Sequence, residues 1–123
     1  DLILIMSQLD LNVLDKQIST DPYLIVEFKG KLDKANIDDV KPALNNFINS
    51  CTDPYLIFDL RYFEYVNSEG IGFLVSLFYA LESKNQKLFL LKPQPQVLDC
   101  FEAVGLTKII SIHELLEDII NQL

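Results

Sequence analysis

The most constraining feature of the sequence is a short apolar run, Tyr55–Leu60, that is followed by a helical pattern from Ser68 to about Ser83. An apolar run of this length is typical of a strand that is buried on both faces of a sheet. The helical pattern carries a broad apolar surface, which indicates a helix packed firmly against that sheet. A buried strand followed by a packed helix predicts an α/β fold.

The rest of the chain continues this alternation of strands and helices. The expected strands are 9–18, 23–29, 55–60, 87–91 and 107–112, and the expected helices are 35–50, 68–83, a third that follows Pro95 and ends before Gly105, and 112–123. Asp21-Pro22 predicts a turn, Gly30 is expected to end the second strand, and residues 61–66 are expected to form a loop. Pro42 indicates that the first helix proper begins near Asp38 or Asp39. The order ββαβαβαβα predicts one mixed sheet of about five strands and about four helices, with right-handed crossovers.

The length of 123 residues fits a single domain over 1–123. Met6 is the only methionine. It is one candidate for the natural first residue, so residues 1–5 are either an addition or an extension from a longer chain. The apolar segment Leu2–Met6 is interpreted either as an additional strand or as a contact in a homodimer.

The formal net charge of −8 argues against nucleic acid as the main partner, because phosphate neutralisation needs clustered basic residues. No apolar stretch approaches the length of a membrane span. Cys51 and Cys100 are too few for a disulfide framework and lie among apolar residues, so we expect buried free thiols. Free thiols indicate a reducing compartment, which favours the cytoplasm.

Signals for catalysis are weak. Ser68 has Val66 and Gly70 as its flanks, which is half of a nucleophile-elbow pattern. The single histidine, His113, is expected at the start of the last helix as a solvated or capping side chain. One histidine and two distant cysteines do not predict a metal site, and Gly70-x-Gly72 is only a fragment of a phosphate loop. We therefore expect no cofactor, no metal and no enzymatic activity.

The junction between the buried strand and the following helix is the segment with the clearest local chemistry. Asn67 is expected to cap the helix, because its side-chain oxygen can accept a bond from an amide in the first turn. Ser68 would then lie exposed beside the positive end of the helix dipole. A phosphate on Ser68 would add −1.5 to −2 charges at that point, which is a workable switch. The alternative is that Asn67 and Ser68 only cap the helix.

Three segments in order resemble the STAS domain, and within it the bacterial anti-sigma-factor antagonists. Gly30-Lys31-Leu32-Asp33 resembles the family's Gly-x-Leu/Ile-Asp, and Asn67–Gly72 resembles its Asp-Ser-Ser/Thr-Gly-Leu-Gly. Pro95–Ile110 is similar to the closing segment of the family. The spacing of the three segments holds from about Ser7 to Leu123, which is nearly the whole chain.

This resemblance implies partner switching rather than catalysis. In such a family, the antagonist binds an anti-sigma factor that is also a serine kinase, and phosphorylation by that kinase breaks the complex. A metal-dependent serine phosphatase then restores the antagonist. The residues implied in partner binding are Asp33, Asn67, Ser68, Glu69 and Gly70, with Ser68 as the phosphorylation site.

Two residues depart from the family pattern. Asn67 replaces the family's Asp, and Glu69 replaces its second Ser or Thr and places a permanent charge beside Ser68. Three outcomes remain open: a normal switch, a weakened switch, or a domain that binds without being phosphorylated. The alternative function is a non-switching STAS scaffold, or a subunit of a signalling assembly or of a lipid or anion transport complex.

Overall fold

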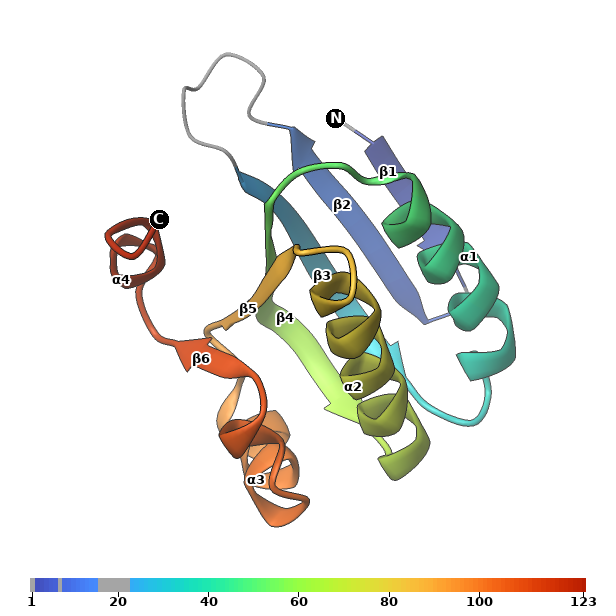
Figure 1. Cartoon of the computed structure of the whole chain (residues 1–123). Coiled ribbons are helices and arrows are strands. Elements are labelled where there is room, and N and C mark those ends of the chain that lie inside the picture. Colours follow the sequence, from blue (N-terminus) through green and yellow to red (C-terminus); the bar gives the residue numbers. More distant parts are fainter. Residues whose placement is uncertain (1, 7, 16–22) are drawn as a thin grey trace.

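A single mixed sheet organises the molecule. The computed structural model describes residues 2–6, 8–15 and 23–123. Within these residues the sheet has six strands in the spatial order β1-β2-β3-β4-β5-β6 (Figure 1). The strands are β1 (Leu2–Met6), β2 (Leu9–Asp15), β3 (Tyr23–Leu32), β4 (Tyr55–Val66), β5 (Lys87–Leu91) and β6 (Ser111–His113). β1, β2 and β3 pair antiparallel, and the pairs from β3 to β6 are parallel.

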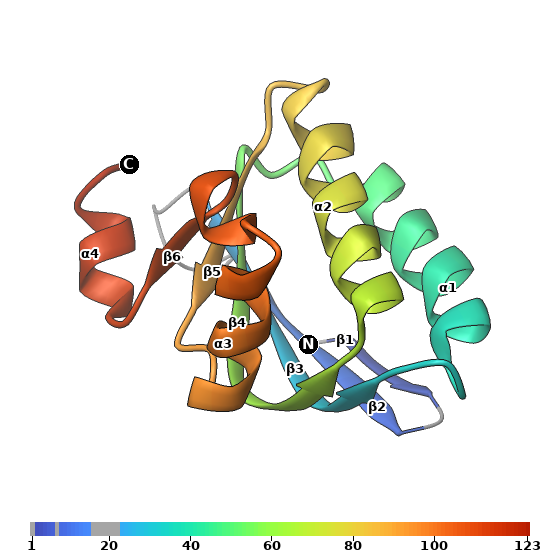
Figure 2. The same cartoon turned by 90° about the horizontal axis from the view of Figure 1, so that it is seen from below.

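Helices cover the two faces of the sheet unequally. They are α1 (Ile37–Ser50), α2 (Ser68–Glu82), α3 (Pro95–Ala103) and α4 (Leu116–Ile120), with a 3-10 turn at Leu106–Lys108. α1 and α2 lie side by side on one face, whereas α4 lies on the opposite face near β5 and β6 (Figure 2). The predicted α/β class is confirmed, and Leu2–Met6 adds a sixth strand to the five that the pattern indicated.

β4 passes through the centre of the core, as the apolar run predicts. Its residues from Leu56 to Leu60 are all buried. Phe58 packs with Phe28 on the face covered by α1, α2 and α3, at a ring-centroid distance of 4.8 Å. Ile57 points to the other face, where it joins Phe89 and Ile119 in a smaller apolar cluster under α4. The strand is therefore buried on both faces.

The ends of β3 and β4 differ from the sequence prediction. Gly30 does not end β3, and residues 61–66 are not a loop, because the parallel ladder continues to the pair Leu32–Val66. Gly30 has a positive φ of 120°, a conformation that glycine adopts easily, and it pairs with Leu9 on one side and Phe63 on the other. β4 is two residues longer than the stretch of β3 with which it pairs. The two extra residues lie at register shifts, one after Asp59 and one after Phe63. These bulges break the simple alternation by which a strand is recognised.

The first helix and the first strand agree more closely with expectation. α1 begins at Ile37, just before the expected Asp38 or Asp39, with Pro42 inside it. The predicted residues 16–18 of the first strand and the predicted turn at Asp21-Pro22 lie outside the described residues.

The C-terminal segment also differs from the prediction. The strand expected at 107–112 lies at Ser111–His113, after the 3-10 turn, and α4 begins at Leu116 rather than at Ile112. Ile112 is used by the sheet instead, where it pairs with Leu90. Gly105, with φ of 78°, follows the end of α3 as predicted.

His113 and the two cysteines lie in environments that differ from the predicted ones. His113 belongs to β6 rather than to a helix start, and its Nε2 lies 2.7 Å from the Ser111 hydroxyl. Cys51 and Cys100 are free thiols in the described part of the chain, but they are only partly buried. Burial raises the pKa of the Cys51 thiol above its ordinary value.

The start of α2 lies very close to the ends of β3 and β4 because residue 70 is a glycine. A Cβ atom at Gly70 would lie 2.7 Å from Val66 Cγ2 and 3.2 Å from Leu32 Cδ2. Gly72, two residues further along α2 and on its exposed side, has open space where a Cβ would lie. The two glycines of the same motif therefore have different structural roles.

We expect Gly70→Val to lower the free energy of unfolding by roughly 1–3 kcal/mol, since the added side chain must displace buried neighbours. Gly72→Ala is the matched control and should raise the same quantity by about 0.5–1 kcal/mol, because alanine is the better helix former. Urea unfolding of the three proteins checks both signs. A Gly70→Val protein as stable as wild type would contradict the close packing described here.

Candidate functional site

The candidate site lies at the edge of the sheet where β3 and β4 end. The two strands finish together at the pair Leu32–Val66, and the Asn67 amide donates a hydrogen bond to the Leu32 carbonyl at 3.2 Å. Asp33 directly follows Leu32 and Asn67 directly follows Val66, so both residues leave the sheet at the same place. Residues from two segments far apart in the sequence meet here because parallel strands bring their carboxyl ends to one edge.

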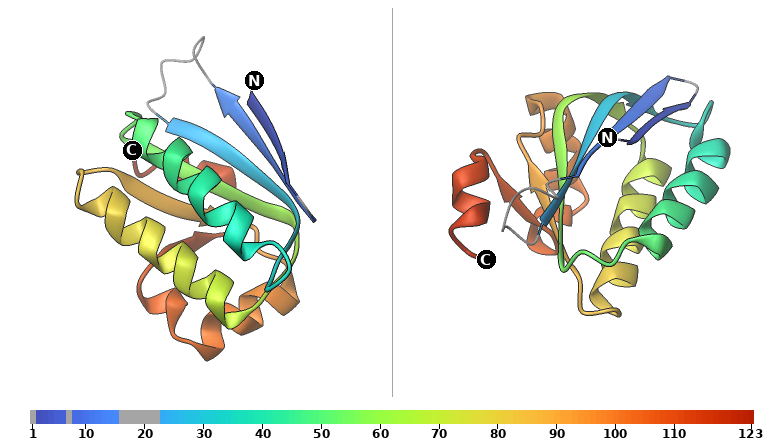
Figure 3. Two further views of the ribbon diagram at one scale, coloured as in Figure 1. Left: turned by 90° about the vertical axis from the view of Figure 1, so that its right-hand side faces the viewer. Right: turned by 90° about the horizontal axis from the view of Figure 1, so that it is seen from above.

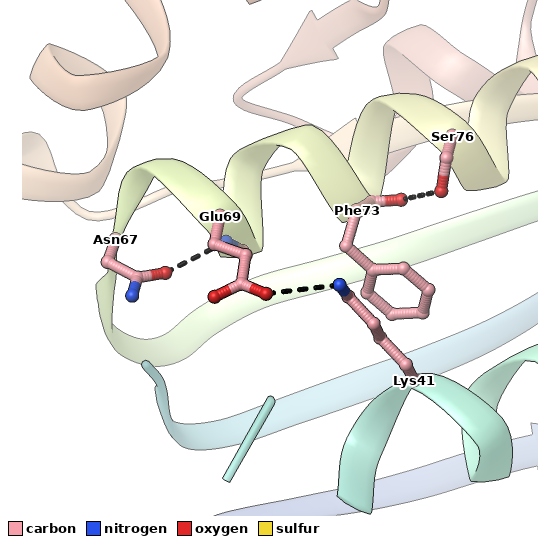
Figure 4. A network of polar contacts seen from close by, with 6 residues as sticks. Lys41, Asn67, Glu69, Phe73 and Ser76 are labelled. Carbon is pink, nitrogen blue, oxygen red and sulfur yellow. Dashed lines mark hydrogen bonds and ion pairs between the residues drawn. The ribbon is translucent and has the colours of Figure 1, made fainter. Parts of the chain in front are cut away.

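Asn67 caps α2 as predicted. Its backbone is extended, and its Oδ1 accepts a hydrogen bond from the Gly70 amide at 2.8 Å (Figure 4). Its own carbonyl accepts from the Ile71 amide at 3.0 Å. The cap fixes the direction in which the chain leaves β4, and so it fixes the position of the first turn of α2.

Ser68 is exposed in the first turn of α2, where the sequence places it. It lines a shallow groove of about 300 Å³ between the β4–α2 junction and α3. The groove is mostly apolar, and its lining residues are Tyr65, Val66, Asn67, Ser68, Ile71, Cys100, Ala103 and Val104. Two of its apolar side chains are strongly exposed, Tyr65 at 47% and Val104 at 53%. The Ser68 hydroxyl thus borders a surface of exposed apolar groups.

Glu69 is turned toward the neighbouring helix. Its Oε2 lies 3.2 Å from the Nζ of Lys41, which comes from α1 (Figure 4). Both side chains remain substantially exposed, so the pair contributes at most about 1 kcal/mol to stability. Its main effect is electrostatic, because the Lys41 ammonium offsets the charge that Glu69 places at this end of α2.

Asp33 is half-buried and its carboxylate is engaged within its own loop. Oδ1 accepts from the Ala35 amide at 2.9 Å, and the Asp33 carbonyl accepts from the Ile37 amide at 2.9 Å. The side chain therefore shapes the turn from β3 into α1. Together with Lys31, Lys34, Glu64, Tyr65 and Asn67 it lines an open polar depression of about 660 Å³. This depression shares Tyr65 and Asn67 with the Ser68 groove.

Asn36 holds this loop in place. It is 1% exposed, its Nδ2 donates to the Lys31 carbonyl at 2.8 Å, and its Oδ1 accepts from the Asp33 amide at 3.0 Å. Asn36 precedes α1, but its side chain makes no cap bond and connects the loop to the end of β3 instead. This role depends on β3 continuing past Gly30, which the sequence pattern did not show.

The five residues expected at the site thus have distinct placements. Asp33, Asn67 and Ser68 lie around adjoining surface depressions, Gly70 is buried against Val66 and Leu32, and Glu69 faces α1. Sequence reasoning missed Lys41 and the α3 side of the groove, formed by Cys100, Ala103 and Val104. No local sequence pattern identifies these residues, because they lie far from Ser68 along the chain and only the tertiary fold brings them near the site.

Metal-binding clusters and membrane-spanning helices are absent from the described residues. Among residues 2–6, 8–15 and 23–123, no cluster of three or more His, Cys, Asp or Glu side chains is arranged to hold a metal ion. No helix in this same part of the chain is long and apolar enough to cross a membrane.

The buried carboxylate of Asp59 forms an ion pair with Arg61, whose Nη2 lies 2.9 Å from Asp59 Oδ2.

Several solved structures share this fold. An anti-sigma factor antagonist from Mycobacterium paratuberculosis superposes with a TM-score of 0.76 at 19% identity, covering 93% of this chain and 92% of that one. The Bacillus cell-fate determinant SpoIIAA in its phosphorylated form gives a TM-score of 0.63 at 18% identity, with coverages of 91% and 97%. A variant of RsbS from Moorella thermoacetica gives 0.68 at 19% identity, with coverages of 91% and 95%.

The sequence was also compared with models of protein families. The model of the STAS domain matches residues 14–119, which includes β3, β4, α2 and every residue of the candidate site. The fold of the solved structures agrees with this match. The chain belongs to the STAS domain family.

Proposed function

We propose that this chain is an anti-sigma-factor antagonist that acts by partner switching in the bacterial cytoplasm. It binds an anti-sigma factor that is also a serine kinase, phosphorylation of Ser68 separates the two proteins, and a serine phosphatase restores the antagonist. The chain itself is a binding protein and not an enzyme. The observation that carries the proposal is the position of Ser68, exposed in the first turn of α2 and bordering an apolar groove.

The groove supplies the kind of surface on which a partner docks. Exposed Tyr65 and Val104 and buried Ile71 line it and supply apolar surface. Exposed Glu64 directly precedes Tyr65 in the chain and so lies near the groove. An apolar centre with a polar rim is the usual composition of a protein–protein interface. The partner segment is expected to carry an apolar anchor and a basic residue that complements Glu64.

Phosphorylation of Ser68 would act on docking far more than on folding. In the free chain, the phosphate would lie at the positive end of the α2 dipole, which tolerates negative charge. In the complex, the same dianion would have to lose water against an apolar surface in a chain that already carries −8 charges. The modification therefore weakens the complex while the antagonist stays folded.

The two departures from the family pattern are compatible with this switch. Asn67 keeps the cap on α2 through the bond from the Gly70 amide, although it lacks the family's carboxylate. Glu69 pairs with Lys41 on α1, whereas Ser68 lines the groove on the α3 side. The permanent charge of Glu69 is thus directed away from the groove, which favours a working switch over a domain that is never phosphorylated.

We expect Ser68→Asp to weaken binding of the kinase partner by at least about tenfold, since a charge must be desolvated at the interface. The partner is first captured on the immobilised wild-type chain from lysate of the source bacterium and identified by mass spectrometry, and affinities are then measured by calorimetry. The control is Ser76→Asp, which adds the same charge to an exposed position on the same helix. It should bind within about twofold of wild type.

The same experiment separates the proposed switch from its alternative. Thermal unfolding of Ser68→Asp should match wild type or exceed it slightly, which excludes unfolding as the cause of lost binding. Equal affinity of Ser68→Asp and wild type for the captured partner would contradict the switch and leave a non-switching scaffold. Mass spectrometry of the chain after incubation with lysate and ATP tests directly whether Ser68 receives a phosphate.

The groove itself is tested by Val104→Glu. Val104 is half-exposed, so the change should leave the fold intact, but it places a carboxylate where we expect an apolar anchor to dock. The expected loss of affinity for the captured partner is at least about tenfold. Tyr79→Glu is the matched control, because Tyr79 is equally exposed on α2 and does not line the groove. Equal losses in both variants would show that the groove is not the docking surface.

A further inference from the structure

The outer edge of the sheet at β1 has features of a pairing surface. β1 is the first strand in the spatial order, so within the described residues only β2 lies beside it (Figure 3). Its five residues pair with β2 in an unbroken antiparallel register from Leu2–Val13 to Met6–Leu9. The opposite side of β1 therefore presents backbone N–H and C=O groups that a further strand can bind.

This edge lacks the features that usually prevent pairing. Leu2–Met6 contains no proline, no lysine and no other charged residue. Its pairing with β2 has no bulge that would turn the edge away. Edge strands of monomeric proteins normally carry such protection. An unprotected apolar edge in a chain with a net charge of −8 therefore calls for an explanation.

The side chains at this edge are incompletely covered. Leu4 and Met6 pack against the main core but remain partly exposed, and Ile5 on the other face is 77% exposed. A strand added beside β1 would cover part of all three. The opposite edge of the sheet differs, because β6 has only three residues and one of them is His113. The two edges are thus not equivalent, and β1 is the longer and more apolar one.

We propose that β1 pairs with β1 of a second copy of this chain, in antiparallel orientation across a two-fold axis. A two-fold axis makes identical strands run antiparallel and leaves no further β1 edge, so association stops at the dimer. The edge itself favours a second copy, because Leu2–Met6 is uncharged and is matched in polarity by the same strand of another copy, whereas it offers no carboxylate to attract a basic strand. The uncharged strand is also a place where two acidic molecules approach without direct repulsion between side chains.

The geometry leaves the Ser68 groove accessible. β1 is separated from β4 by β2 and β3, and the groove lies between β4, α2 and α3. Because the two β1 strands run in opposite directions across the axis, the two Ser68 sites lie at opposite ends of the joined sheet. The dimer is therefore independent of the proposed function, and each copy can bind its own partner.

Sedimentation equilibrium of the full chain at about 5 to 500 µM tests the proposal. We expect a concentration-dependent dimer whose dissociation constant rises at least about tenfold in Ile5→Lys, because a charge on the edge strand opposes pairing. The control is Tyr79→Lys, which changes a similarly exposed apolar residue on α2 and should leave the constant within about twofold. Since Ile5 is exposed, Ile5→Lys should keep the wild-type unfolding temperature.

Hydrogen exchange locates the interface in the wild-type protein. Amides of Leu2–Met6 that face away from β2 should exchange at least about tenfold more slowly in the dimer than at monomer concentrations. A chain that remains monomeric over the whole range would overturn the proposal. So would a dimer that survives Ile5→Lys, or one in which the β1 amides exchange as fast as in the monomer.

Discussion

The parallel pairing of β3 with β4 is the interaction on which the rest of the structure depends. It places the two longest strands side by side in the centre of the sheet, and Phe28 and Phe58 meet across it in the core. Its last rung, Leu32–Val66, and the bond from the Asn67 amide to the Leu32 carbonyl determine where both loops leave the sheet. Because α1 and α2 start from these loops, their positions follow from the length of this ladder.

Local chemistry was sufficient to predict the parts of the site that depend on neighbouring residues. The cap by Asn67 and the exposure of Ser68 follow from the first turn of a helix, whose amides and side chains interact over three or four positions. The burial of β4 was equally evident, because an apolar run needs cover on both sides. These features do not require knowledge of which segments meet in space.

The features that were not predicted depend on contacts between distant segments. Residues 61–66 contain Arg61 and Glu64 and read as a loop, yet they extend the ladder because two bulges accommodate the extra residues. The Lys41–Glu69 pair joins residues 28 positions apart, and α3 approaches Ser68 only through the tertiary fold. Likewise, Ile112 fits a helical period, but pairing with Leu90 places it in a strand. Tertiary hydrogen bonds thus override local preference at these positions.

The ends of the described chain lie far from the candidate site. In Figure 1, the start of β1 and the C-terminus lie in the upper half of the molecule, whereas α2 begins at the bottom. The left panel of Figure 3 shows the same separation from another side. A neighbouring domain, an affinity tag or a solid support attached before β1 or after α4 would therefore lie away from the start of α2. The domain can be tethered from either end and still present Ser68 to a large macromolecule.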